Sequence, residues 1–162
     1  MLIWKNNQTN RRTLRSIINA SKHFGWFISY DSDGAVPEMI TIITSITLLF
    51  FDYDQALIDL LDDCKKPDID DVNVTRITEM DSWEELFDCK YSDHDDLDDG
   101  IIRFNMPGYD QPFYFDSHLF LPILKNKTSK YHFTIRIFGN CHGAFIKDES
   151  NDLCGVILGY RR

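Results

Sequence analysis

The sequence predicts one α+β domain, in which a helical N-terminal half packs on a C-terminal antiparallel β-sheet. Three observations support this fold class. Apolar residues recur at helical spacing within about residues 8–66, and the alternation typical of strands fills about residues 101–162. An acidic connecting part, about residues 67–100, shows neither pattern clearly. No repeat or low-complexity linker divides the 162 residues, so residues 1–162 are expected to share one core.

Two helices are expected in the N-terminal half besides the segment from Met39 to Phe51. The first runs from about Asn10 to His23, with Thr9 or Asn10 as its N-cap, because a side-chain oxygen there can accept from first-turn amides. The second begins after Asp52 or Asp54 and ends before Pro67. Its apolar residues lie at helical spacing: Ala56, Leu57, Leu60, Leu61 and Cys64.

The apolar segment from Met39 to Phe51 fits two interpretations. Its isoleucines and threonines favour a strand. Its length and the preceding Pro37 and Glu38 favour a buried helix, and we expect the helix. Further on, Val72–Ile77 alternates like a short strand, and Ser82 with Glu85 resembles a capping box that predicts a short helix over Trp83–Phe87.

The C-terminal part reads as an antiparallel meander. Residues 131–138 (YHFTIRIF) alternate most clearly between apolar and polar side chains, as a half-buried strand does. Other expected strands lie in residues 101–106, 112–120, 143–147 and 153–160.

Charge is distributed unevenly along the chain. The formal net charge is −9, and residues 52–99 hold 18 acids against four basic residues. The flanking parts each carry a small excess of basic residues. A negative field of this kind repels nucleic acid and anionic lipid and attracts cationic partners. We therefore expect a protein partner, and neither a nucleic acid nor a membrane. That partner is expected to contact a broad acidic face that begins at Asp52.

The densest acidity lies in residues 88–100 (DCKYSDHDDLDDG), which is expected to be a solvated loop. Acids that flank an accessible tyrosine can attract and anchor a basic partner. The candidate partner-binding residues are Asp88, Tyr91, Asp93, Asp95, Asp96, Asp98 and Asp99.

No metal or cofactor is expected. A calcium-binding EF-hand loop that starts at Asp95 would have Leu97 at its third position and Met106 at its twelfth, and both are wrong. The turn at Asp31–Gly34 fails in the same way, because its twelfth position is Ile40. Cysteine and histidine are not spaced as zinc ligands.

No catalytic residue is expected either. The motif His132-Phe133-Thr134 has the H-x-T form of two-histidine phosphoesterases, but that form needs a second copy and occurs here once. The four cysteines form no C-x-x-C pair, and no apolar leader stretch opens the sequence. Free thiols in a cytoplasmic protein are therefore expected.

In its length, its acidic stretch and its lack of a catalytic motif, the chain resembles bacterial toxin immunity proteins, including those of contact-dependent growth inhibition. The resemblance lies in general character and assigns no residue a role. It implies a cytoplasmic inhibitor that binds and neutralises a cognate toxin, often a basic nuclease. Two alternatives remain open: a non-catalytic adaptor or regulatory module, and an enzyme of unrecognised class.

Overall fold

The computed structural model describes residues 1–69, 83–90, 93–105, 108, 110–120 and 131–160. Two helices precede or interrupt the strands of the N-terminal half, α1 (Gln8–Ala20) and α2 (Gln55–Asp62). The strands are β1 (Phe24–Tyr30), β2 (Pro37–Thr44), β3 (Thr47–Asp52), β4 (Glu84–Cys89), β5 (Asp95–Asp96), β6 (Ile101–Phe104), β7 (Phe113–Asp116), β8 (His132–Phe138), β9 (Cys141–Lys147) and β10 (Leu153–Leu158). Short 3₁₀ turns form η3 (Asp98–Gly100) and η4 (Ser117–Phe120).

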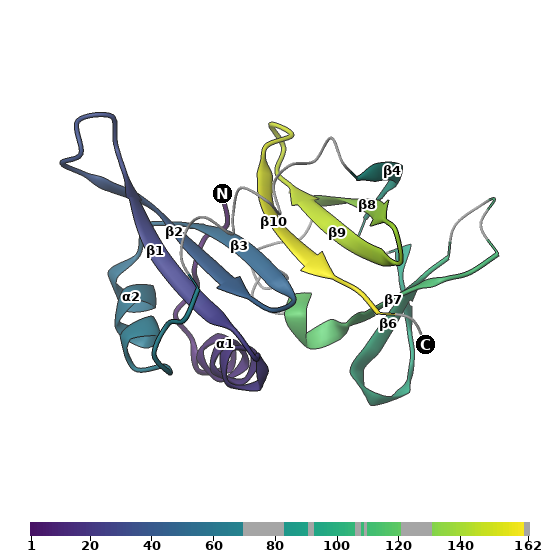
Figure 1. The fold of residues 1–162 in the computed structure, drawn as a ribbon, viewed down its shortest axis with the longest axis horizontal. Coiled ribbons are helices and arrows are strands. Elements are labelled where there is room, and N and C mark those ends of the chain that lie inside the picture. The colour runs from purple at the N-terminus through teal and green to yellow at the C-terminus, as the bar shows by residue number, and fades with distance from the viewer. Residues whose placement is uncertain (70–82, 91–92, 106–107, 109, 121–130, 161–162) are drawn as a thin grey trace.

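A seven-stranded antiparallel sheet dominates the fold, in the order β1-β2-β3-β10-β9-β8-β4 (Figure 1). A second sheet has the order β5-β6-β7. The predicted arrangement of a helical N-terminal half packed on a C-terminal sheet is therefore wrong. The N-terminal half supplies three strands to the main sheet, and β3 pairs directly with β10.

Met39–Phe51 is a β-hairpin and not the expected helix. The chain reverses after Thr44, whose hydroxyl oxygen accepts from the amides of Ile46 at 3.3 Å and Thr47 at 3.0 Å. In a helix these two amides would donate to backbone carbonyls, and here the Thr44 side chain accepts from them instead. The isoleucine and threonine content was the correct signal, because branched side chains pack well on a pleated sheet.

Both helices lie on the same side of β1, β2 and β3 (Figure 1). α1 begins earlier than predicted, at the N-cap Asn7, whose side chain accepts from the amide of Asn10 at 2.8 Å. The predicted cap of α2 is confirmed, because the Asp54 carboxylate accepts from the amides of Ala56 and Leu57. Each helix buries an apolar stripe. Leu14 in the stripe of α1 and Leu57 in the stripe of α2 have no exposed surface.

The central strands bury both of their faces. Ile42, Leu49 and Ile157 point into the core that contains the helices and the small sheet. Their chain neighbours Ile43, Leu48 and Val156 belong to a second cluster, with Phe50 and Phe145. Because successive strand residues point to opposite faces, these pairs place apolar side chains on both sides of the sheet.

The C-terminal strands confirm one prediction and correct two. β8, β9 and β10 form the expected meander. The expected strands at residues 101–106 and 112–120 are shortened to β6 and β7 and belong to the second sheet, not to that meander. The short helix expected over Trp83–Phe87 is wrong, since residues 84–87 form part of β4, which pairs with β8. Pairing with an existing strand outweighs a local capping signal there.

The strand expected at Val72–Ile77 lies outside the described residues. Within the described part of the chain, no helix is both long and apolar enough to cross a membrane.

Candidate functional site

Most of the predicted acidic residues lie on a short hairpin and not on a solvated loop. We define the acidic hairpin as residues 93–105, which contain β5, η3 and β6. Asp95 and Asp96 pair with Arg103 and Ile102 in antiparallel register, and the amide of Leu97 donates to the carbonyl of Ile101 at 2.8 Å. The hairpin therefore has a defined backbone structure.

Apolar residues attach the acidic hairpin to the core. Ile102 and Phe104 are almost completely buried, with 0% and 1% exposed surface. The Phe104 ring lies edge-on to Phe115 of β7, at a centroid distance of 5.8 Å. Because alternate residues of β6 face inward, the acids of β5 are held at a fixed position relative to the body of the protein.

Several carboxylates of the acidic hairpin already bond within the chain. Asp95 accepts from Arg103 at 3.2 Å and from the Asn105 side-chain amide at 2.9 Å. Asp96 lies 3.0 Å from Nε2 of His94, and Asp93 accepts from the backbone amide of Lys90 at 2.7 Å. These contacts limit the movement of the carboxylates, yet Asp96 keeps 86% of its side chain exposed. Asp93, Asp95 and Asp99 are also exposed.

The remaining predicted site residues are located as follows. Asp88 lies on β4 and accepts from the hydroxyl of Thr134 on β8 at 2.5 Å, so it supports a strand pair and is not part of the hairpin. Asp98 lies at the hairpin turn, although its side chain is outside the described set. Tyr91, the proposed anchor, also lies outside the described residues.

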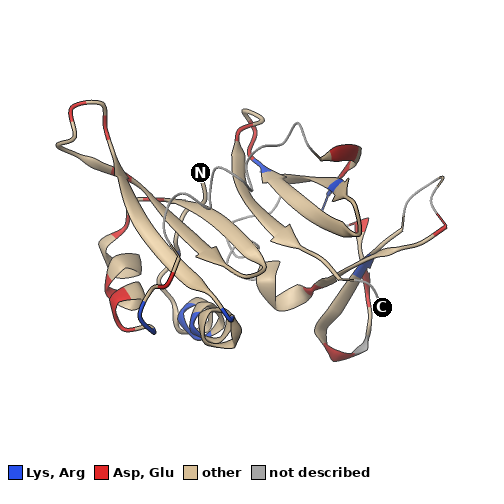
Figure 2. Ribbon diagram, in the orientation of Figure 1, with Lys and Arg blue, Asp and Glu red and all other residues tan. Residues whose placement is uncertain are grey.

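Two groups of the described acids in residues 52–99 lie far apart, and others, such as Glu84 and Glu85 of β4, belong to neither group. Asp54, Asp59, Asp62 and Asp63 lie on or beside α2, at the opposite end of the molecule from the acidic hairpin (Figure 2). The first group has local structural roles, such as the ion pair of Asp63 with Arg15 at 3.7 Å. The continuous acidic face expected from the sequence is therefore not formed by these two groups.

The turn of the acidic hairpin had a sequence signal that the sequence analysis missed. Asp99 and Gly100 both have positive φ, 68° and 74°. Asp-Gly between two apolar-containing segments is a strong hairpin signal, because both residues tolerate this conformation. The same dipeptide explains why residues 93–105 fold back instead of remaining extended.

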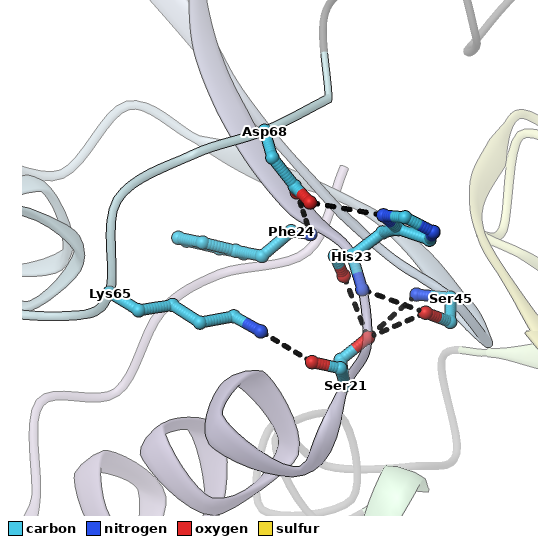
Figure 3. A network of polar contacts seen from close by, with 6 residues as sticks. All are labelled: Ser21, His23, Phe24, Ser45, Lys65 and Asp68. Carbon is cyan, nitrogen blue, oxygen red and sulfur yellow. Dashed lines mark hydrogen bonds and ion pairs between the residues drawn. The ribbon is translucent and has the colours of Figure 1, made fainter.

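A second polar cluster joins α1, β1 and the turn between β2 and β3 (Figure 3). His23 Nδ1 lies 3.0 Å from the Asp68 carboxylate, which also accepts from the amide of Phe24 at 2.7 Å. That amide, and then the His23 side chain, lower the pKa of Asp68. Lys65 donates to the carbonyl of Ser21 at the C-terminal end of α1.

This cluster contains serine, histidine and aspartate but lacks the geometry of a nucleophilic triad. The Ser21 hydroxyl donates to the carbonyl of His23 at 2.7 Å, and the Ser45 hydroxyl accepts from the amide of His23 at 3.0 Å. Both hydroxyls thus bond the main chain of His23, whereas a nucleophile must bond the ring. The cluster connects the end of α1, the start of β1, the turn between β2 and β3, and the segment after α2.

The cysteines give no reactive thiolate at the acidic hairpin. Burial raises the pKa of the Cys89 thiol to about 12, and the charges of Asp93 and Asp88 act in the same direction. All four cysteines are free thiols. In the H-x-T motif, the Thr134 hydroxyl is occupied by Asp88. Among the described residues, no three His, Cys, Asp or Glu side chains gather as metal ligands.

The acidic hairpin is therefore the candidate functional site, as a candidate binding surface. It combines exposed carboxylates with a backbone that is fixed to the core. Comparisons of the chain with protein families, curated proteins and solved structures found no match.

Proposed function

We propose that this protein is an inhibitor of the toxin immunity type, which binds a basic partner domain through the acidic hairpin. One observation carries the proposal. The described carboxylates of Asp93, Asp95, Asp96 and Asp99 are exposed on a hairpin whose inward residues are buried. The hairpin lies at one end of the molecule, where a partner can reach it (Figure 2).

The fixed backbone matters for affinity. Ordering a flexible loop on binding costs free energy, and a segment that is already ordered avoids much of that cost. The contacts of Asp95 with Arg103 and of Asp96 with His94 hold these carboxylates near one conformation before a partner arrives. A cluster of this kind also raises the association rate with a basic protein, by up to about a thousandfold at low salt.

The four carboxylates are not equivalent. Asp95 faces the guanidinium of Arg103, so its charge is partly neutralised within the hairpin. Asp93, Asp96 and Asp99 have no ion pair with Lys or Arg in the described part of the chain, and they supply most of the field toward a partner. These three residues are the ones to change in a test.

The test uses the protein encoded directly upstream of this chain as the partner. If that protein is toxic, co-expression with this chain should restore growth. Replacing Asp93, Asp96 and Asp99 by asparagine should weaken protection and slow association by about tenfold at low salt, with a flatter salt dependence. Asn is also tolerated at the positive φ of position 99.

A matched control removes the same charge at the other end of the molecule. Asp59, Asp62 and Asp63 are exposed on or beside α2, and their replacement by asparagine should change the association rate by less than about twofold. Equal slowing in both variants would show that net charge, and not the acidic hairpin, drives association. An upstream protein without toxicity would overturn the immunity proposal.

A further inference from the structure

A groove on another part of the surface does not include the exposed carboxylates of the acidic hairpin. It has a volume of about 530 Å³ and is bounded by α1, the turn between β2 and β3, and η4. Ser21 and Ser45, which lie side by side in Figure 3, form part of one wall. A groove of this size fits a small organic molecule, for which pockets commonly measure about 300–1,000 Å³.

The lining of the groove is mainly apolar. Ile17 of α1 and Leu119 of η4 are buried and contribute to it, with exposed surfaces of 8% and 3%. Ala20 and Ile46 are exposed and extend the same lining toward solvent. The 41% exposure of Ile46 marks it as one of the few large apolar side chains that the fold leaves uncovered. An apolar ligand would remove this surface from water.

Two cations lie at the same groove. Arg12 on α1 and Lys22, two residues after the end of α1, are exposed and line the groove. Neither forms an ion pair within the described part of the chain, whereas Arg15 on another face of α1 pairs with Asp63. In a chain with net charge −9, two cations without carboxylate partners at an apolar groove favour an anionic ligand.

The groove also contains the carboxylate of Asp116 and the imidazole of His118. Asp116 accepts from the backbone amide of His118 and lies 2.9 Å from its Nδ1. This carboxylate is therefore engaged by its own neighbour. The groove as a whole presents two cations, one engaged carboxylate and several hydroxyl groups around an apolar lining.

We propose that this groove binds a small amphipathic organic anion, with a carboxylate head group and an apolar body. The head group contacts Arg12 or Lys22, and the apolar body lies against Ile17, Ala20, Ile46 and Leu119. The groove does not include the exposed carboxylates of the acidic hairpin, although it adjoins the hairpin turn where His118 lies against Gly100. Its test therefore succeeds or fails independently of the toxin immunity proposal.

The test measures binding of three probes to the full chain by amide chemical shifts. Octanoate carries both chemical features, octanol lacks the charge, and acetate lacks the apolar body. Octanoate should shift the amides of Ile17, Ala20 and Ile46 in a saturable way. Its affinity should exceed that of octanol by about fivefold to tenfold, and acetate should not saturate the site. Added salt should weaken octanoate but not octanol.

Variants assign the roles of the groove residues. Replacing Arg12 and Lys22 together by glutamine should reduce octanoate binding to the level of octanol. Arg15→Gln is the matched control, because Arg15 lies on the same helix but pairs with Asp63, and it should change affinity by less than about twofold. Ala20→Trp should fill the groove and abolish binding of both octanoate and octanol.

Two results would overturn the proposal. The first is equal affinity for octanoate and octanol in the unchanged chain, since the cations would then play no part. The second is a set of shifts that spreads over the whole protein without saturation, which indicates nonspecific contact. Thermal unfolding of each variant shows whether a loss of binding comes from the groove or from loss of the fold.

Discussion

The imidazole of His118 lies directly against Gly100, so that a β-carbon at position 100 would sit 2.8 Å from Cε1 of the ring. Gly100 also has a φ of +74°. This contact joins the turn of the acidic hairpin to η4. A side chain at position 100 is therefore opposed by both backbone conformation and space.

Gly100→Ala should destabilise the protein by about 1–2 kcal/mol through backbone strain, with at most about 0.5 kcal/mol more for displacing the exposed end of the His118 ring. Displacement breaks the contact of the ring with Asp116. Gly34→Ala is the control, since Gly34 has a φ of +71° but open space around its β position, and only the strain should appear. Urea unfolding measures both variants. Gly100→Ala should lose slightly more stability than Gly34→Ala, and adding His118→Ala to Gly100→Ala should remove this difference. If the difference persists, His118 is not its cause.

The junction of β3 with β10 gives a second prediction. A β-carbon at Gly155 would lie 2.7 Å from the carbonyl oxygen of Leu48 and 3.1 Å from Cδ2 of Leu49. Backbone cannot yield as a side-chain end can, so Gly155→Ala should cost about 2–3 kcal/mol in urea unfolding. The control is Gly143→Ala on β9, where the nearest atoms are 3.4–3.5 Å away, at ordinary contact distance. Similar losses in the two variants would contradict the close approach of β3 to β10.

Cysteine labelling gives a third prediction. Burial, with the charges of Asp93 and Asp88, raises the pKa of Cys89 to about 12, so the reactive thiolate is scarce at neutral and mildly alkaline pH. Iodoacetamide at pH 8 should therefore modify the exposed Cys141 and leave Cys89 unmodified. Cys89 should react once urea unfolds the chain. Mass spectrometry locates the modified residue, and early labelling of Cys89 in the folded chain would contradict its burial.

Where the sequence predictions succeeded, the signal was local. The alternation of residues 131–138 predicted β8 correctly, although residues 133–136 are all buried, and Asp54 caps α2 with its own carboxylate. The Met39–Phe51 hairpin lacked that signal. Its strands carry apolar residues on both faces, as Ile42 with Ile43 and Leu48 with Leu49 show, so the alternation that distinguishes a strand is lost.

The candidate site was predictable in composition but not in arrangement. The acidic stretch identified exposed carboxylates correctly at Asp93, Asp95, Asp96 and Asp99. The contact of Asp95 with Arg103 depends on the register of β5 and β6, which residue spacing alone did not supply. The separation of the α2 acids from the acidic hairpin depends on the order of strands in the whole fold.

The Asp68 cluster gives a fourth prediction, for the dependence of stability on pH. The amide of Phe24 and the side chain of His23 lower the pKa of Asp68 from its usual 3.8. A depressed pKa in the folded state means that the stabilisation is fully present above about pH 3.8 and disappears as the pH falls through the folded value. Asp68→Asn should therefore be less stable than the unchanged chain at pH 6, and the difference should shrink below pH 3.8. Urea unfolding across this pH range measures the difference.

Asp59→Asn on α2 serves as the control, because Asp59 contacts only the Gln55 side chain among the described residues and should show a much smaller difference at pH 6. A constant difference for Asp68→Asn down to pH 2 would contradict a role for the ionised carboxylate.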